Sequence, residues 1–179
     1  MDRLRQYEIA FVGLKTGIHQ FNFDIDDRFF AYFNNSLVNK GDLKVHLNFD
    51  KKPSFFILYF RIEGFVHLPC DRCSAELDFP LDADFTIVVK FDDHSENEHD
   101  DSMADVIYID RNETHLNTGQ LIYEFINLSI PLHRINCDNL NNKKPCDYEI
   151  LSRLVAPAPK KQKPPVDPRW KDLTKIKLN

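Results

Sequence analysis

The chain has 179 residues, 42% of them apolar and 28% charged, so it can bury a hydrophobic core and is not disordered throughout. Its longest apolar run, residues 55–60, is far too short to span a bilayer, and the first residues lack the apolar stretch of a secretory signal. We therefore expect a cytoplasmic protein with no membrane partner, in a compartment where thiols stay reduced.

The net charge of −5 hides an asymmetry. Residues 153–179 contain eight Lys/Arg and two acids, a net charge of +6, which leaves −11 for the rest of the chain. Prolines and lysines dominate residues 156–165, a composition that predicts a linker, and a short amphipathic helix is expected at 166–177. We therefore divide the chain into a β-rich domain, 1–152, and a basic Pro/Lys-rich linker with a short C-terminal segment, 153–179. The basic segment suggests an anionic partner.

In chain order, most of the first half shows the alternation of apolar and polar side chains that is typical of half-buried strands. The expected strands are residues 7–14, 18–26, 41–52, 54–69 and 75–91. Between the second and third, residues 26–35 predict a short helix capped by Asp26 or Asp27. The first half of strand 54–69 is apolar on both faces, which favours a central position, whereas Pro80 indicates an edge or a bulge.

The second half of the chain contains the main helix signal. An acidic loop is expected at 92–105 and a short strand at 106–110. A helix near residues 118–130 is predicted by apolar residues at helical spacing, with Asn117 as N-cap, Gln120 completing a capping box, and Pro131 after its end. Many strands in series with one main helix predict an α+β fold, an antiparallel β-sheet-dominated single domain with a basic C-terminal arm.

Four cysteines form the candidate metal site. Cys70 and Cys73 have the C-x₂-C spacing of a zinc knuckle, and Cys137 and Cys146 would complete a tetrahedral thiolate set for one Zn²⁺ ion. Two other interpretations stay open. The first pair could be a redox C-x-x-C, which favours a helix N-terminus that is not expected between two strands. The cysteines could also be ordinary small buried residues.

The order of several segments resembles the YceD family of bacterial large-ribosomal-RNA accumulation proteins. The resemblance is carried by the strand–turn–strand segment 64–91 with its C-x-R-C turn, the strand 105–110, the helical segment 119–137 and the D-P-R-W ending 166–177. It implies a non-enzymatic factor that supports synthesis, processing or accumulation of 23S rRNA, during 50S assembly. The implied partner is large-subunit rRNA or a basic large-subunit ribosomal protein, with no small-molecule substrate.

The candidate RNA contacts are cations in the C-terminal arm, one aromatic residue and the arginine of the cysteine turn. They are Arg72, Lys160, Lys161, Lys163, Arg169, Trp170, Lys171, Lys175 and Lys177. Trp170 could instead anchor the arm on its own domain, and Arg72 could offset thiolate charge or have no role.

Function classes other than RNA binding are less supported. The alternative function is a zinc-stapled protein-interaction module without direct RNA contact. Catalysis is unsupported, because the chain has only five glycines and none of the common phosphate-loop, nucleophile-elbow or H-E-x-x-H motifs.

Overall fold

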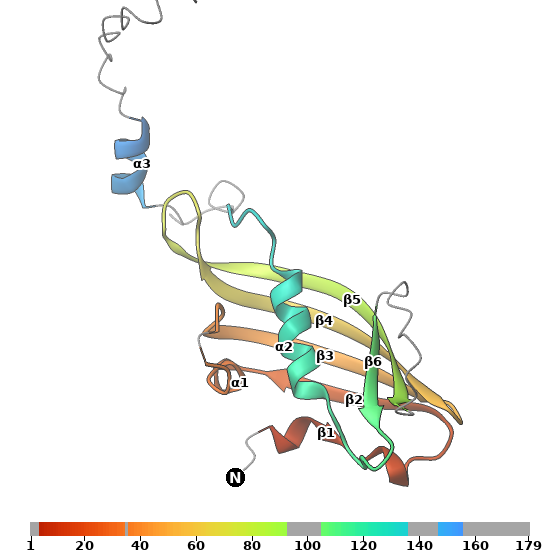
Figure 1. The fold of residues 1–179 in the computed structure, drawn as a ribbon. Coiled ribbons are helices and arrows are strands. Elements are labelled where there is room, and N and C mark those ends of the chain that lie inside the picture. Colours follow the sequence, from red (N-terminus) through yellow and green to blue (C-terminus); the bar gives the residue numbers. More distant parts are fainter. Residues whose placement is uncertain (1–3, 35, 93–104, 136–146, 156–179) are drawn as a thin grey trace, which may run out of the picture.

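A computed structural model describes residues 4–34, 36–92, 105–135 and 147–155. Its main feature is a five-stranded sheet of order β2-β3-β4-β5-β6 (Figure 1). The strands are β2 (Gly17–Ile25), β3 (Lys40–Lys51), β4 (Phe55–Pro69), β5 (Glu76–Asp92) and β6 (Val106–Asp110). The pairs β2–β3, β3–β4 and β4–β5 are antiparallel, and β5–β6 is parallel.

Smaller elements flank this sheet. A two-stranded sheet joins β1 (Glu8–Ile9) to β7 (Leu116–Asn117), and 3-10 turns occupy Arg5–Tyr7 and Phe11–Gly13. The α-helices are α1 (Asp27–Phe30), α2 (Thr118–Ser129) and α3 (Tyr148–Val155). In the part of the chain that the structure describes, no helix is long and apolar enough to cross a membrane.

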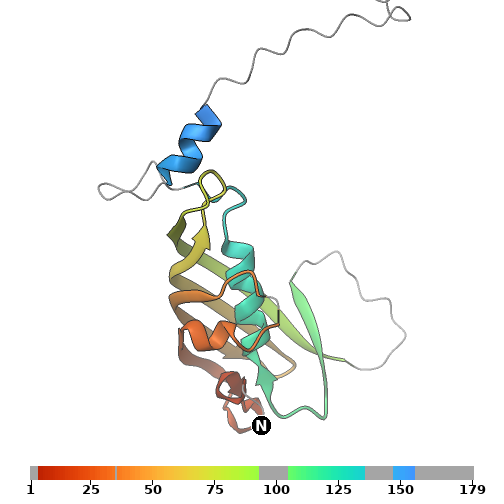
Figure 2. The same cartoon turned by 90° about the vertical axis from the view of Figure 1, so that its left-hand side faces the viewer.

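The period-two pattern of the strands separates the two faces of the sheet. In β3, Leu43, Val45, Leu47 and Phe49 are buried on the inner face, while their alternate neighbours from Asp42 to Asn48 are exposed on the outer face. Helix α2 lies along the inner face, as Figure 2 shows. The outer face is therefore available to solvent and to partners.

Aromatic contacts join α2 to the sheet. Phe125 of α2 stacks on Phe85 of β5, with ring centroids 4.4 Å apart, and meets Phe60 of β4 edge-on at 5.1 Å. Tyr123 of the same helix stacks on Phe33 at 3.8 Å. These contacts bury the apolar stripe of a helix that is far in sequence from the strands it covers.

Most of the expected elements are confirmed, including the α+β class, the main helix and the central position of 54–69. Asp26 caps α1 by accepting a hydrogen bond from the Arg28 N–H at 2.9 Å. Pro80 lies in a strand that has no second strand partner at that point among the described residues, as expected for an edge.

Two expectations need correction, the strand at 7–14 and the capping box of α2. Residues 7–14 form a two-residue strand between 3-10 turns, because this segment wraps an edge of the core and only Glu8 and Ile9 pair with another strand. The sheet is dominated by antiparallel pairs, as expected, and the pair β5–β6 is parallel. Asn117 caps α2 through the Gly119 N–H, but Gln120 hydrogen-bonds Glu124 and does not close a capping box. Helix α3 was not expected from the sequence; it includes residues 152 and 153, between which the proposed domain division lies.

Candidate functional site

The β4–β5 turn holds the two cysteines of the C-x₂-C motif. Cys70 and Cys73 are 2% and 0% exposed. The Cys70 N–H donates to the Ala75 carbonyl at 2.9 Å, and the Ser74 N–H donates to the Cys70 carbonyl at 2.8 Å. Ser74 adopts a left-handed φ of 58° to close the turn. The turn is thus a tight knuckle with both thiols turned into the protein, between two strands and not at a helix N-terminus.

A distant segment is bound to this knuckle. The Asp71 N–H donates to the Arg134 carbonyl at 3.0 Å, and the Arg134 N–H donates to Asp71 Oδ2 at 2.9 Å. The Arg134 guanidinium also lies 2.7 Å from Asp71 Oδ1. Hydrogen bonds from the Arg134 backbone and side chain lower the pKa of the Asp71 carboxyl below its usual value. The segment after α2 is therefore held against the residue next to Cys70.

Only part of the sequence-predicted site falls in the described residues. Cys70 and Cys73 share the turn, and Arg72 is exposed on it. Cys137 and Cys146 lie outside the described residues, as does every candidate of the C-terminal arm: Lys160, Lys161, Lys163, Arg169, Trp170, Lys171, Lys175 and Lys177. Among the described residues, no three or more potential ligands form a metal-binding group.

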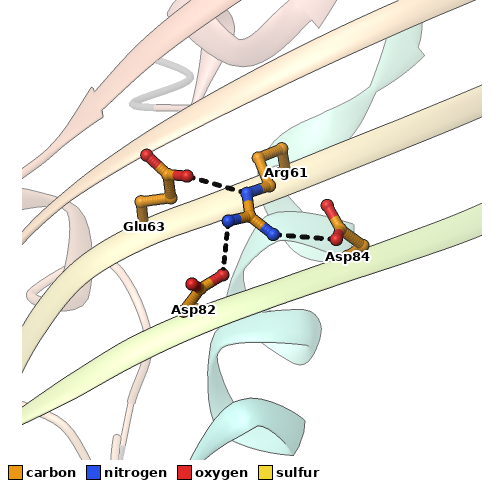
Figure 3. A network of polar contacts seen from close by, with 4 residues as sticks. All are labelled: Arg61, Glu63, Asp82 and Asp84. Atoms are coloured by element: carbon orange, nitrogen blue, oxygen red, sulfur yellow. Dashed lines mark hydrogen bonds and ion pairs between the residues drawn. The ribbon is translucent and has the colours of Figure 1, made fainter.

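The outer face of β4 and β5 carries a second polar cluster (Figure 3). Arg61 is surrounded by three carboxylates. Its Nε lies 2.8 Å from Glu63, its Nη2 lies 2.6 Å from Asp82, and its Nη1 lies 2.8 Å from Asp84. The hydrogen bond to Glu63 is the main cause that raises the pKa of the Arg61 guanidinium, and bonding to Asp84 adds to it. Three carboxylates thus share one guanidinium, so the cluster has a net charge of −2.

The negative charge continues along β5 toward the cysteine turn. The ring of His67 hydrogen-bonds Asp78 at 2.7 Å and lies 3.7 Å from Glu76. We call the outer surface of β4 and β5 formed by these groups the acidic face; its members are Arg61, Glu63, His67, Glu76, Asp78, Asp82 and Asp84. The aromatic side chains of Tyr59 and Phe65, 43% and 40% exposed, lie on the same face. Surface of this kind suits a cationic partner.

Sequence reasoning missed Arg134 and the Arg61 cluster for different reasons. Asp71 and Arg134 are 63 residues apart, and no local pattern connects them. The Arg61 contacts follow from the hairpin register, in which Arg61 pairs with Asp84 and Glu63 with Asp82. The alternating acids of β5 and the turn at Cys70–Cys73 were both visible in the sequence, so this register could have been found by pairing the two strands outward from the turn.

Comparison with known proteins identifies the family of the chain. No curated protein and no solved structure matches it. A family model described as large ribosomal RNA subunit accumulation protein YceD matches residues 58–177. The match covers more than half of the chain and includes most of β4, the cysteine turn, β5, α2 and the basic arm up to residue 177. The chain therefore belongs to the YceD family.

Proposed function

We propose that this protein is a non-enzymatic factor that supports the synthesis, processing or accumulation of 23S rRNA in the cytoplasm, during assembly of the 50S subunit. The observation that carries the proposal is the YceD family match over residues 58–177, whose description concerns accumulation of large-subunit ribosomal RNA. The partner is large-subunit rRNA or a basic large-subunit ribosomal protein. The absence of common catalytic motifs from the sequence supports a binding role.

The distribution of charge supports different roles for the basic arm and the acidic face. The basic arm offers seven cations at 160–177 for phosphate contacts and Trp170 for stacking on a base. The acidic face repels phosphate and would orient the RNA toward the arm. Direct RNA contact is thus assigned to the arm, with Arg72 on the exposed cysteine turn as an additional contact.

The proposal is tested by the ratio of 23S to 16S rRNA in cells that lack the protein. We expect this ratio to fall on deletion and to recover when the wild-type chain is supplied. A normal ratio in the deletion strain during growth and after cold shock would contradict the proposal. Purified protein should also leave 23S rRNA fragments uncleaved and unmodified, since the proposed role is not catalytic.

A triple substitution tests RNA contact by the arm. Lys160, Lys161 and Lys163 changed together to Gln should weaken binding to a 23S rRNA fragment, as measured by fluorescence anisotropy. The matched control changes three exposed lysines of the domain, Lys15, Lys40 and Lys44, and should leave affinity nearly unchanged. Equal losses in the two variants would argue against a role specific to the arm.

A second candidate function is a zinc-stapled protein-interaction module without direct RNA contact. The buried knuckle favours it, because two thiols on one tight turn are the donor set that tetrahedral zinc takes in C-x₂-C sites. Arg134, which is bonded to Asp71, precedes Cys137 by three residues, a reach of at most about 11 Å of extended chain. One Zn²⁺ held by Cys70, Cys73, Cys137 and Cys146 would join the segment after α2 to the β4–β5 turn.

Elemental analysis distinguishes the zinc site from buried cysteines. We expect one zinc per chain in wild-type protein purified without chelator, and loss of the metal in both Cys70→Ser and Cys137→Ser. Wild-type protein without metal would eliminate the site. Metal lost in only one variant would show that the two cysteine pairs do not share an ion.

A further inference from the structure

One edge of β5 is only partly used by the sheet. Strand β6 pairs with β5 from Val88 to Asp92, whereas β4 pairs with it from Glu76 to Lys90. In the part of the chain that the structure describes, no strand therefore pairs with residues 76–87 of β5 on the side away from β4. Figure 1 shows β6 beside one end of β5 alone. An edge of this kind offers main-chain donors and acceptors to another extended chain.

The direction of the main-chain groups follows from one hydrogen bond. The Val88 N–H donates to the Asp105 carbonyl, on the β6 side, at 2.8 Å. The register of β4 with β5 is uninterrupted, so alternate residues point the same way. The N–H and C=O groups of Asp82, Asp84 and Thr86 therefore point to the open edge. Pro80 occupies the next such position, where its missing N–H removes no bond to β4.

Side chains of opposite character border this edge. On the outer face, Asp82 and Asp84 have side chains 69% and 71% exposed, and Arg61 is the single guanidinium that they share with Glu63. On the inner face, the half-buried ring of Phe85 stacks on Phe125 of α2. A strand added here would place one set of its side chains beside carboxylates and the other beside aromatic rings.

We propose that the edge of β5 at residues 81–87 binds an extended protein segment in which Lys or Arg alternates with apolar residues, and that this segment adds to the sheet as a sixth strand. Main-chain hydrogen bonds would supply affinity. The outer and inner faces of β5 would select a segment in which cationic and apolar side chains alternate. The carboxylates favour cationic residues directly opposite. They disfavour RNA, which is anionic, and pairing with the same edge of a second copy, which would bring like charges together.

This inference deepens the proposed function by naming a partner chemistry for the acidic face, and it rests on the strand geometry and not on RNA contact by the arm. Failure of peptide binding would leave the 23S rRNA test untouched. Likewise, a normal 23S rRNA ratio in the deletion strain would not decide whether the peptide binds.

The test uses the full-length protein and a fluorescein-labelled decapeptide of alternating Lys and Val. We expect saturable binding by anisotropy, with amide hydrogen exchange slowed at Asp82, Asp84 and Thr86. Asp82→Asn with Asp84→Asn should bind roughly 2- to 30-fold more weakly, from loss of two cross-strand charge pairs. The control, Asp24→Asn with Asp42→Asn, changes outer-face carboxylates of β2 and β3 and should bind as wild type.

A backbone variant separates strand addition from general attraction of charges. Thr86→Pro removes an N–H that points away from β4, so the protein should keep its circular dichroism spectrum and lose peptide binding. A peptide of the same composition in Lys-Lys-Val-Val order should also bind more weakly. The proposal would be overturned if Thr86→Pro bound the alternating peptide as wild type does, or if the Lys-Lys-Val-Val peptide bound as tightly as the alternating one. It would also be overturned if the control with Asp24→Asn and Asp42→Asn weakened binding equally, or if no amide of the edge exchanged more slowly.

The chain's own C-terminal segment is the competing occupant. Lys175 and Lys177 alternate there with Ile176 and Leu178. If the peptide binds full-length Lys175→Glu/Lys177→Glu but not the wild type, the C-terminal segment occupies the edge of β5 in the wild type. That result would overturn the proposal of a separate partner. Equal binding by wild type and this variant supports the proposal.

Discussion

At Gly64, the backbone of β4 comes close to β3. Gly64 has a φ of +140°, and a Cβ built there would lie 2.2 Å from the Asp42 carbonyl oxygen. We predict that Gly64→Ala lowers the free energy of unfolding by more than about 1 kcal/mol, because both the conformation and the space exclude a side chain. Urea denaturation measures the effect. Gly13→Ala is the control, since nothing lies within 4 Å of its Cβ position and stability should change little.

The contact between Asp71 and Arg134 should depend on pH in the acid range. The Asp71 pKa is lowered in the folded protein, so the contact stabilises at pH values above the ordinary carboxyl pKa of 3.8. This stability is lost as the pH falls below 3.8 through the folded pKa. We predict that exchange of the Arg134 amide, followed by NMR, accelerates over this interval beyond the intrinsic trend. Asp71→Asn should show no such step, and an identical step in that variant would assign it to another group.

At the scale of elements, Phe125 is one of the buried side chains that join α2 to the sheet. Phe125 is 7% exposed and contacts aromatic rings of both β4 and β5. We predict that Phe125→Ala lowers the free energy of unfolding by about 3–5 kcal/mol, the usual range for a buried phenylalanine. Leu128, 72% exposed on the same helix, is the matched control, and Leu128→Ala should change stability by less than about 0.5 kcal/mol. Similar losses in the two variants would contradict the assignment of the effect to the ring contacts of Phe125.

At the scale of the whole molecule, charge is polarised between an acidic body and a basic arm. The net charge of −5 combines +6 at residues 153–179 with −11 elsewhere. If the arm carries RNA contact, the affinity for single-stranded rRNA should fall as the salt concentration rises. The logarithmic slope of this fall should have a magnitude of at most about 5, the value for seven phosphate contacts by the arm. The Lys160/Lys161/Lys163→Gln variant should make this slope less steep, reducing its magnitude by about 2 in anisotropy titrations. A slope that the variant leaves unchanged would place the contacts elsewhere.

Much of the fold could be predicted because the order of apolar and polar residues within a strand shows which of its faces are buried. Alternation in 41–52 and 75–91 identified the buried side chains of β3 and β5, and the apolar start of 54–69 identified a central strand. The segment 7–14 was misread, because its apolar residues contact the core from 3-10 turns and not from a paired strand. Alternation reports which side of a chain is buried, but it does not report whether a second strand is present.

The candidate site could be predicted only in part. The turn position of Cys70 and Cys73 followed from the strands on either side, and the structure adds that both thiols are buried. The parallel pairing of β6 and the docking of Arg134 against Asp71 had no local signal. Both depend on where a connection returns the chain, which is set by packing of the complete sheet and α2.

The sequence by itself determined the strand faces, the main helix, the acidic body with its basic arm and the resemblance to the YceD family. These follow from residue identity and short-range spacing, which control burial and charge. Only the tertiary structure decided that Arg61 joins three carboxylates, that residue 134 lies against the cysteine turn, and that residues 76–87 of β5 have no second described strand beside them. Each of these depends on groups that come together only when distant segments fold against one another.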